Sequence, residues 1–219
     1  MMIRGLIFDM DGVLLDTERI YFSCWQKSAA ELGYTLKPEY ALAVRSCCQH
    51  YAESYLKRML GEEFDYLAVR DRRRELVSQY IAEHGITQKP GIAKLVQYCE
   101  NNGIRVAVAT ATSKELAEER LAMAGLSDVF SVIVGGDQVE RGKPAPDIYL
   151  TAAQALGLPA EACAAVEDSP NGIAAAFAAG CTPIMVPDLT APEDCFQPLL
   201  LGVAADLEQV IPILQAVSE

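Results

Sequence analysis

The sequence lacks a surplus of basic residues. Of its 219 residues, 18 are Lys or Arg and 30 are Asp or Glu, so the formal net charge is −12. Sequence-independent binding to nucleic acid or to an anionic membrane needs a basic surface, so we expect neither partner. A small anionic ligand remains compatible with this composition, because a few local cations and backbone amides are enough to bind a phosphate.

The chain also lacks C-x-x-C pairs and long apolar runs. Its seven cysteines are scattered, which predicts neither a zinc knuckle nor a thioredoxin-type motif but small buried hydrophobic residues in a reducing compartment. The adjacent Cys47 and Cys48 leave metal binding or oxidation open as an alternative. No apolar run approaches the roughly 18 residues of a membrane helix, and no basic segment precedes an apolar one at the start, so we expect a cytoplasmic protein.

Short apolar runs alternate with helical patterns along most of the chain. The composition, 51% hydrophobic and 22% charged, is that of a soluble globular protein, and the length allows one full core plus a smaller domain. The runs that predict buried strands are 3–8, 104–109, 131–134, 164–166 and 182–186. Helical spacing follows at 92–99, at 149–156 before Gly157, and from a predicted capping box at 112–115 to Gly125. This alternation predicts an α/β fold with a parallel sheet covered on both faces.

Residues 16–87 break that alternation. Their apolar residues have helical spacing, beginning with Tyr21 and Trp25, and no convincing strand is visible. The charged run RDRRREL at 70–76 is typical of a solvated helix face. We therefore expect an all-helical domain at 16–87, inserted into a core made of 1–15 and 88–219. Pro90 marks the return to the core, as a hinge or a helix start.

Polar residues follow four of the apolar runs. In open α/β sheets, ligands bind beyond the carboxyl ends of the strands, so these residues should converge. Taken singly, each has an ordinary explanation as a loop carboxylate, a turn hydroxyl, a solvated loop lysine or a helix start with Ser169 as its N-cap. Their joint order favours a shared site. In chain order they are Asp9 and Asp11; Thr110, Ala111 and Thr112; Lys143; and Glu167 and Asp168.

The chemistry of this set is coherent. Four carboxylates at one sheet edge repel one another unless a hard cation lies among them, which suggests Mg²⁺. A hydroxyl, helix-start amides and a lysine suit a phosphoryl group. A carboxylate beside Mg²⁺ and a phosphate can act as a nucleophile and form an aspartyl-phosphate. A second carboxylate two residues further on can protonate the leaving oxygen and later activate water.

Four segments in a characteristic order carry a family resemblance. DMDGVLLDTE, AVATATS, GKPAPDIYL and AVEDSPNGI resemble the haloacid dehalogenase superfamily, in its branch of β-phosphoglucomutase-like sugar-phosphate phosphatases with a helical cap. The resemblance covers nearly the whole chain. It implies a Rossmann-like core, with 16–87 as its mobile cap.

The resemblance also implies roles for individual residues. Asp9 would be the nucleophile and Asp11 the general acid and base, which points to phosphoryl transfer because dehalogenases typically lack the second aspartate. The residues implied to hold the phosphoryl group are Thr110, Ala111 and Lys143. Those implied to hold the metal are Asp9, Asp11 through its backbone carbonyl, Asp168, and Glu167 as a ligand or as support for the ligands.

The chain departs from the family pattern in its cap. Related mutases carry a histidine where this chain has Tyr21, and a tyrosine with a pKa near 10 cannot replace it as a proton partner at neutral pH. The usual glycine-containing substrate loop is absent, and AVRSCCQHYAE offers Arg45 and His50 instead. Arg45 would grip a distal phosphate or hydroxyl of the substrate, with a surface position as the alternative. We expect His50 and His84 on the cap surface.

These patterns together predict a monomeric, Mg²⁺-dependent phosphatase of small phosphorylated metabolites, most simply sugar phosphates. Two alternatives stay open. One is a mutase that moves a phosphoryl group between two positions of one sugar, against which the missing histidine and glycine count. The other is a non-catalytic sugar-phosphate binder on the same scaffold, against which the intact set of site residues counts.

Overall fold

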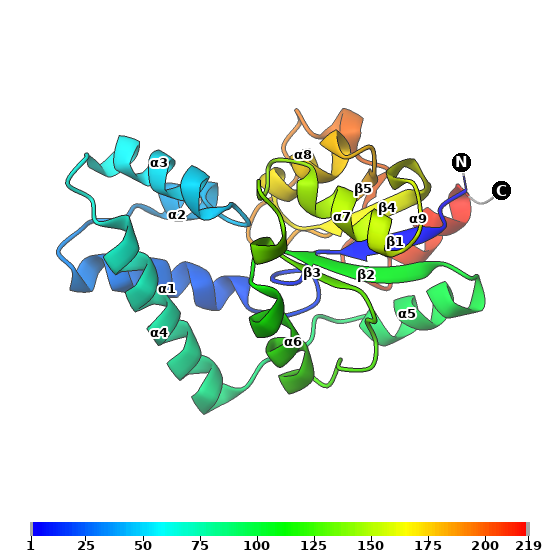
Figure 1. The fold of residues 1–219 in the computed structure, drawn as a ribbon, viewed down its shortest axis with the longest axis horizontal. Helices are drawn as coiled ribbons and strands as arrows, with labels where there is room; N and C mark the ends of the chain where they lie inside the picture. Colours follow the sequence, from blue (N-terminus) through cyan, green and yellow to red (C-terminus); the bar gives the residue numbers. More distant parts are fainter. Residues whose placement is uncertain (1, 218–219) are drawn as a thin grey trace.

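The computed structural model describes residues 2–217 and contains a six-stranded, fully parallel sheet (Figure 1). The strands lie in the order β3-β2-β1-β4-β5-β6. Their bounds are β1 Gly5–Phe8, β2 Arg105–Thr110, β3 Ile133–Gly135, β4 Cys163–Glu167, β5 Thr182–Met185 and β6 Gly202–Val203. Each of the five apolar runs contains or overlaps a strand. The sixth strand was not predicted, because two residues that include a glycine carry no recognisable period.

Helices cover both faces of the sheet. One face carries α5 (Ile92–Asn101), α6 (Lys114–Met123) and α9 (Val210–Ala216), and the other carries α7 (Asp147–Ala155) and α8 (Pro170–Ala178). Short 3₁₀ turns occupy Gly136–Gln138, Ala160–Ala162 and Gln197–Leu199. Strand β1 serves both layers, since Leu6 and Phe8 pack into one core and Ile7 into the other. The predicted α/β, Rossmann-like parallel sheet is confirmed.

The order of the strands places a crevice at the carboxyl end of β1. Strand β1 pairs with β2 on one side and with β4 on the other, so the chain changes direction across the sheet between β1 and β4. The Asp9 N–H extends this pairing by donating to the Val166 carbonyl at 2.9 Å. Ligands of such sheets bind at this switch point, which is where Asp9, Thr110 and Glu167 emerge.

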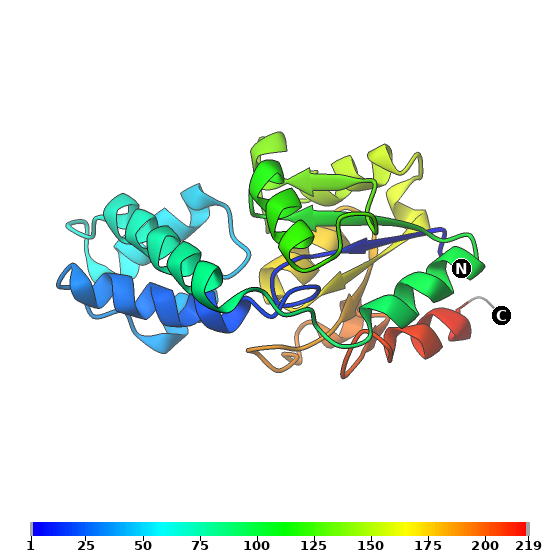
Figure 2. The same cartoon turned by 90° about the horizontal axis from the view of Figure 1, so that it is seen from below.

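Residues 18–84 form a separate helical lobe beside the carboxyl edge of the sheet (Figure 2). Its helices are α1 Glu18–Glu31, α2 Pro38–Ala43, α3 Gln49–Leu60 and α4 Tyr66–His84. The lobe has its own apolar core, in which Trp25, Leu56 and Val69 are buried. Its two connections to the sheet run side by side: the Asp16 N–H donates to the Thr87 carbonyl, and the Lys89 N–H to the Leu14 carbonyl, both at 2.9 Å.

Two of the helix ends predicted from the sequence are found in the structure, and a third is not. Ser169 caps α8 by accepting from the Gly172 N–H, and Gly157, at φ +67°, follows the end of α7. The predicted capping box at 112–115 is wrong. The Lys114 N–H at the start of α6 donates instead to Asp137 Oδ1 at 2.7 Å, and the Thr112 hydroxyl serves another residue.

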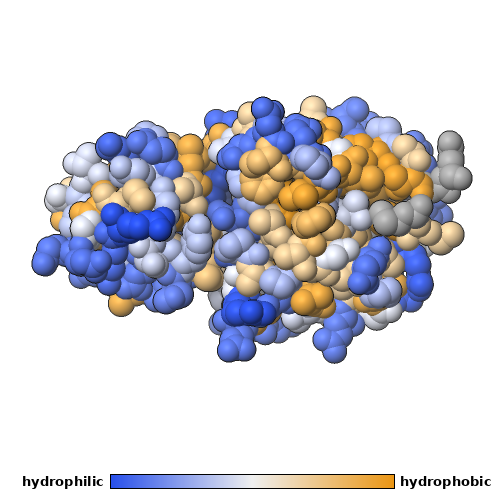
Figure 3. Space-filling model, turned by 90° about the horizontal axis from the view of Figure 1, so that it is seen from above, coloured by the Kyte–Doolittle hydropathy of each residue, from blue (hydrophilic) through white to orange (hydrophobic). Residues whose placement is uncertain are grey.

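The surface differs between the two lobes. In the view of Figure 3, the more hydrophobic residues gather over the sheet lobe, whereas the helical lobe is mostly hydrophilic. Leu150 and Phe177 are among the large apolar side chains that stay exposed. Within residues 2–217, each helix is too short or too polar to cross a membrane.

Gly91, at the start of α5, offers a test of packing between that helix and the C-terminal segment. Its φ is +94°, and a Cβ there would lie 2.3 Å from the Glu208 nitrogen. Gly33 has a similar φ of +83° with nothing within 4 Å of its Cβ position. We expect Gly33→Ala to lower the free energy of unfolding by about 1 kcal/mol through backbone strain alone. Gly91→Ala should lower the free energy of unfolding by about 2 kcal/mol more than Gly33→Ala does, because its Cβ would clash with Glu208. Urea denaturation measures both values, and equal losses in the two variants would contradict this packing.

Candidate active site

Lys143 is the centre of the site. It is fully buried, and its Nζ donates to Asp9 Oδ1 at 2.6 Å, to Glu167 Oε1 at 2.6 Å and to the Ala109 carbonyl at 3.2 Å. Burial alone would lower the pKa of this ammonium, but Asp9 and Glu167 raise it above its ordinary value. The lysine therefore remains charged among the ends of three neighbouring strands.

Glu167 is held by four donors. Its Oε1 accepts from Lys143 and from the Tyr149 hydroxyl, and its Oε2 accepts from the Asp168 N–H at 3.2 Å and from Ser169 Oγ at 3.3 Å. A Cβ at Gly172 would lie 1.9 Å from Glu167 Cδ, so the first turn of α8 packs tightly against this carboxylate. Both oxygens of Glu167 are thus already satisfied by the protein.

Asp9, Glu167 and Asp168 form a buried acidic cluster. Each offers a carboxylate oxygen, and these atoms lie within 4.8 Å of one another. Burial raises the pKa of Asp9 well above its ordinary value; Lys143 opposes this shift, and the other two carboxylates add to it. Both oxygens of Asp168 are buried and find no hydrogen-bond partner within residues 2–217. Such oxygens suit a hard divalent cation, which would compensate the buried negative charge.

The side chain of Asp11 has a different environment from that of Asp9. Its Oδ1 accepts from the Thr17 hydroxyl at 2.6 Å and lies 3.7 Å from Arg120 Nη1, and its Oδ2 accepts from the Thr112 hydroxyl at 3.1 Å. These contacts explain why Thr112 does not cap α6. The carboxylate is held in one orientation and is not one of the three in the acidic cluster.

The carboxyl end of β2 completes the site on the sheet side. Thr110 is buried, and its Oγ1 accepts from the Thr112 N–H at 3.2 Å. Gly136 lets the next loop approach closely, because a Cβ there would lie 2.6 Å from the Ala111 carbonyl. A cavity of about 780 Å³ between the lobes is lined on the sheet side by a set that includes Asp9, Asp11, Thr110, Ala111 and Lys143.

The helical lobe supplies cations and aromatic rings to the same cavity. Arg70, Arg73 and Arg74 line it. The prediction of a solvated face at 70–76 is wrong for Arg70 and Arg73, which are half-buried, whereas the side chain of Arg74 is 62% exposed. The Arg73 guanidinium lies 4.4 Å from the ring centre of Trp25 and 5.2 Å from that of Tyr21. Burial lowers the pKa of Arg73 to about 10. This wall of the cavity is positively charged.

Arg45 is buried, so its alternative position on the surface is wrong. Its guanidinium contacts Asp168 in the sheet lobe. His50 and His84 are exposed, as expected. All seven cysteines have free thiols; Cys47 and Cys48 line the cavity, where burial raises the pKa of Cys47 to about 12 and disfavours a reactive thiolate.

Sequence reasoning missed Glu18, Tyr149 and Arg120. All three are buried helical residues that face the site from α1, α7 and α6. Burial raises the pKa of Glu18 to about 8; Arg45 opposes this shift, and Asp11 and Asp9 add to it. An acid in the first turn of a helix is ordinary in a sequence, so only the fold reveals its position.

A comparison of the sequence with models of protein families shows to which family the chain belongs. The model of the haloacid dehalogenase-like hydrolases matches residues 3–180. The chain belongs to this family. The resemblance found in the four motifs is therefore confirmed, and with it the prediction of an enzyme of the hydrolase class.

Individual relatives are similar over most of their length. Hexitol phosphatase A of Escherichia coli is 37% identical over 191 residues, covering 87% of this chain and 85% of the relative. Protein CbbY of Rhodobacter capsulatus is 34% identical over 196 residues, covering 85% and 86%. A crystal structure of a mutant CbbY from Rhodobacter sphaeroides in complex with xylulose-(1,5)bisphosphate superposes with a TM-score of 0.78 at 28% identity, covering 95% of this chain and 96% of that one.

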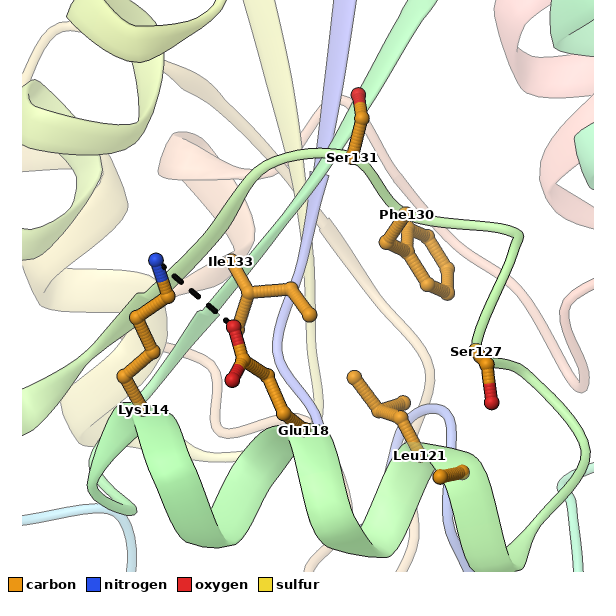
Figure 4. Close-up of a pocket in the computed structure, with 8 residues that line it drawn as sticks. Lys114, Glu118, Leu121, Ser127, Phe130, Ser131 and Ile133 are labelled. Carbon is orange, nitrogen blue, oxygen red and sulfur yellow. Dashed lines mark ion pairs between the residues drawn. The ribbon is translucent and has the colours of Figure 1, made fainter.

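A second, smaller pocket lies outside this site. It has a volume of about 220 Å³ and is formed by α6 and the segment leading into β3 (Figure 4). Leu121 and Phe130 line its apolar part, and Lys114 and Glu118 form an ion pair of 3.8 Å at its side. It contains none of the residues around Lys143 and is therefore separate from the candidate site.

Glu18 predicts a dependence of stability on pH. An unfolded Glu18 loses its proton near its ordinary pKa of 4.5, whereas the folded protein keeps it up to about pH 8. Unfolding therefore releases a proton between these values, and the free energy of unfolding falls as pH rises through the window. In the presence of a chelator, Glu18→Gln should reduce the fall in melting temperature between about pH 5 and about pH 8 by about 2–4 °C.

The control for this experiment is Glu119→Gln, which neutralises an exposed acid on α6. It should keep the full fall in melting temperature. If Glu18→Gln followed the same curve as wild type, the buried carboxyl would not be protonated in this window.

Proposed function

We propose that the protein is a Mg²⁺-dependent phosphatase of small phosphorylated metabolites, with sugar phosphates as its substrates. The observation that carries this proposal is the buried Lys143, which bridges Asp9 and Glu167 at the edge of a cavity that also holds Asp11 and Thr110. The names of the relatives, among them a hexitol phosphatase, support the substrate class.

The acidic cluster fits a divalent cation. We assign Asp9, Asp168 and the backbone carbonyl of Asp11 as its ligands, because both oxygens of Glu167 are taken by protein donors. Glu167 then acts through Lys143, whose position it fixes. When bound, Mg²⁺ would neutralise the negative charge of the site and help to bind the phosphoryl oxygens.

The other residues provide the steps of the reaction. Asp9 attacks the phosphorus and forms an aspartyl-phosphate, while Lys143, Thr110 and the Ala111 amide stabilise the phosphoryl oxygens. Asp11 gives a proton to the leaving oxygen and later takes one from the attacking water. The hydroxyls of Thr17 and Thr112 hold the Asp11 carboxylate in place for both transfers.

The helical lobe favours hydrolysis over the mutase reaction. Tyr21 lies at the cavity with the guanidinium groups of Arg73 and Arg120 each 5.2 Å from its ring centre. A phenol, with an ordinary pKa near 10, does not exchange a proton at neutral pH as does the imidazole that related mutases carry at this position. The aspartyl-phosphate would therefore be resolved by water, with the lobe acting as a cap that excludes bulk solvent during transfer.

Asp9→Asn tests the nucleophile. It should reduce the release of inorganic phosphate from hexitol and sugar monophosphates by about 10³-fold or more, because an amide cannot form the acyl phosphate. Asp128→Asn, an exposed change of the same kind, should leave the rate unchanged. Isomerised sugar phosphate is measured in parallel: its formation by wild type without free phosphate would establish the mutase instead.

Asp168→Asn tests the metal site. The variant should need at least about tenfold more Mg²⁺ for half-maximal phosphate release, since it loses one charged ligand. A chelator should abolish the activity of wild type, and added Mg²⁺ should restore it. Full activity in the chelator would contradict a metal-dependent mechanism.

A further inference from the structure

Arg45 joins the helical lobe to the acidic cluster. It lies between α2 and α3, and its side chain is 5% exposed. Its Nη1 is 3.3 Å from Asp168 Oδ2, and its Nη2 donates to the Asp168 carbonyl at 3.1 Å and to Thr190 Oγ1 at 2.8 Å. A cation of the helical lobe therefore contacts the carboxylate that we assign as a metal ligand.

The backbone around Arg45 is docked on the same part of the core. Asn171 Nδ2 donates to the carbonyls of Ala43 and Arg45 at 3.2 and 3.1 Å. The Cys48 N–H donates to the Lys143 carbonyl at 3.2 Å, and a Cβ at Gly142 would lie 2.6 Å from Cys48 Cβ. Residues 43–48, which we call the docking loop, thus contact the two core segments that carry Lys143 and Asp168.

The surroundings of the Arg45 guanidinium are strongly acidic. Glu18 and Asp168 have buried carboxylate oxygens without a hydrogen-bond partner among the described residues, and Nε and Nη1 of Arg45 are also buried without one. Burial raises the pKa of both Glu18 and Asp168 above their ordinary values, and the charge of Arg45 opposes this shift. The guanidinium is therefore held by the two hydrogen bonds of Nη2 and by its charge next to Asp168, and it does not saturate the oxygens of that carboxylate.

We propose that Arg45 competes with the divalent cation for Asp168, so that docking of the loop and binding of the metal oppose each other. This inference rests on the metal site of the proposed function. A metal ion on an Asp168 oxygen would lie within a few ångströms of Nη1, and two cations at that distance in a buried site repel strongly. The coupling is reciprocal. If docking of the loop lowers the affinity for the metal by some factor, binding of the metal lowers the equilibrium constant for docking by the same factor.

The competition gives an order to the events at the site. Arg45 balances the charge of Asp168 when the loop is docked, and its withdrawal would free the Asp168 oxygens for a metal ion. A phosphoryl group adds negative charge beside Asp168 and so offsets the repulsion between Arg45 and the metal. Substrate would then favour the docked loop with the metal in place.

Titration of the purified protein with Mg²⁺ alone, followed by calorimetry, tests the competition. Arg45→Gln should bind Mg²⁺ at least about fivefold more tightly than wild type, because the competing charge is gone. The matched control is Arg58→Gln, which removes an exposed arginine that stacks on Tyr55 in the same lobe. It should change the affinity by less than about twofold. Equal or weaker binding by Arg45→Gln would overturn the proposal.

Hydrogen exchange of the wild-type protein gives a second measurement that needs no variant. Mg²⁺ should speed exchange in the docking loop, including the Cys48 amide that bonds to Lys143. Unchanged or slower exchange would overturn the proposal. Its failure is distinct from that of the proposed function. If wild type does not bind Mg²⁺, the metal site itself is wrong; if both proteins bind equally and release phosphate, only the competition is wrong.

Discussion

The fold and the site both depend on one buried ammonium group. Lys143 bonds to groups at the carboxyl ends of β2, β1 and β4, which are three neighbouring strands of the sheet. Without it, Asp9 and Glu167 would have no cationic side chain in contact among residues 2–217, and burying carboxylates without such a partner is costly in a protein interior. The same positive charge that permits these carboxylates to be buried is also available to a phosphoryl group. Structural stability and catalytic electrostatics are therefore supplied by the same atom.

The whole chain is negatively charged, but the wall of the cavity that the helical lobe provides is positively charged. The protein carries a formal net charge of −12, yet Arg70, Arg73 and Arg74 come together on the wall of α4 that faces Asp9 and Asp11. Cations gathered on one wall of a cavity with low-dielectric surroundings raise the electrostatic potential locally on that wall. Local arrangement, and not total charge, thus allows an acidic protein to bind small anions.

Much of this arrangement can be predicted from the sequence, and the limit has a physical cause. Asp9, Thr110 and Asp168 follow buried strands, and the carboxyl ends of parallel strands must meet. Glu18, Arg73 and Tyr149 lie on helices, where the face turned toward the site depends on how distant elements pack. The helical spacing of residues in the sequence cannot by itself distinguish a solvated arginine from one that stacks on Trp25, as Arg73 does. The capping box failed for the same reason, since Thr112 found a better partner 101 residues away in Asp11.

The insertion of the helical lobe after β1 has a consequence for how the chain assembles. Of the six strands, β1 is synthesised first, but its partners β2 and β4 begin only at Arg105 and Cys163. The contacts that bury β1 are thus far apart in sequence and costly to close, whereas the lobe has an apolar core drawn from one continuous segment. On the ribosome, the lobe can become compact before β2 and β4, the partners of β1, have been synthesised. Because the lobe's two connections are then already paired, its folding brings β1 close to the chain that will form the rest of the sheet.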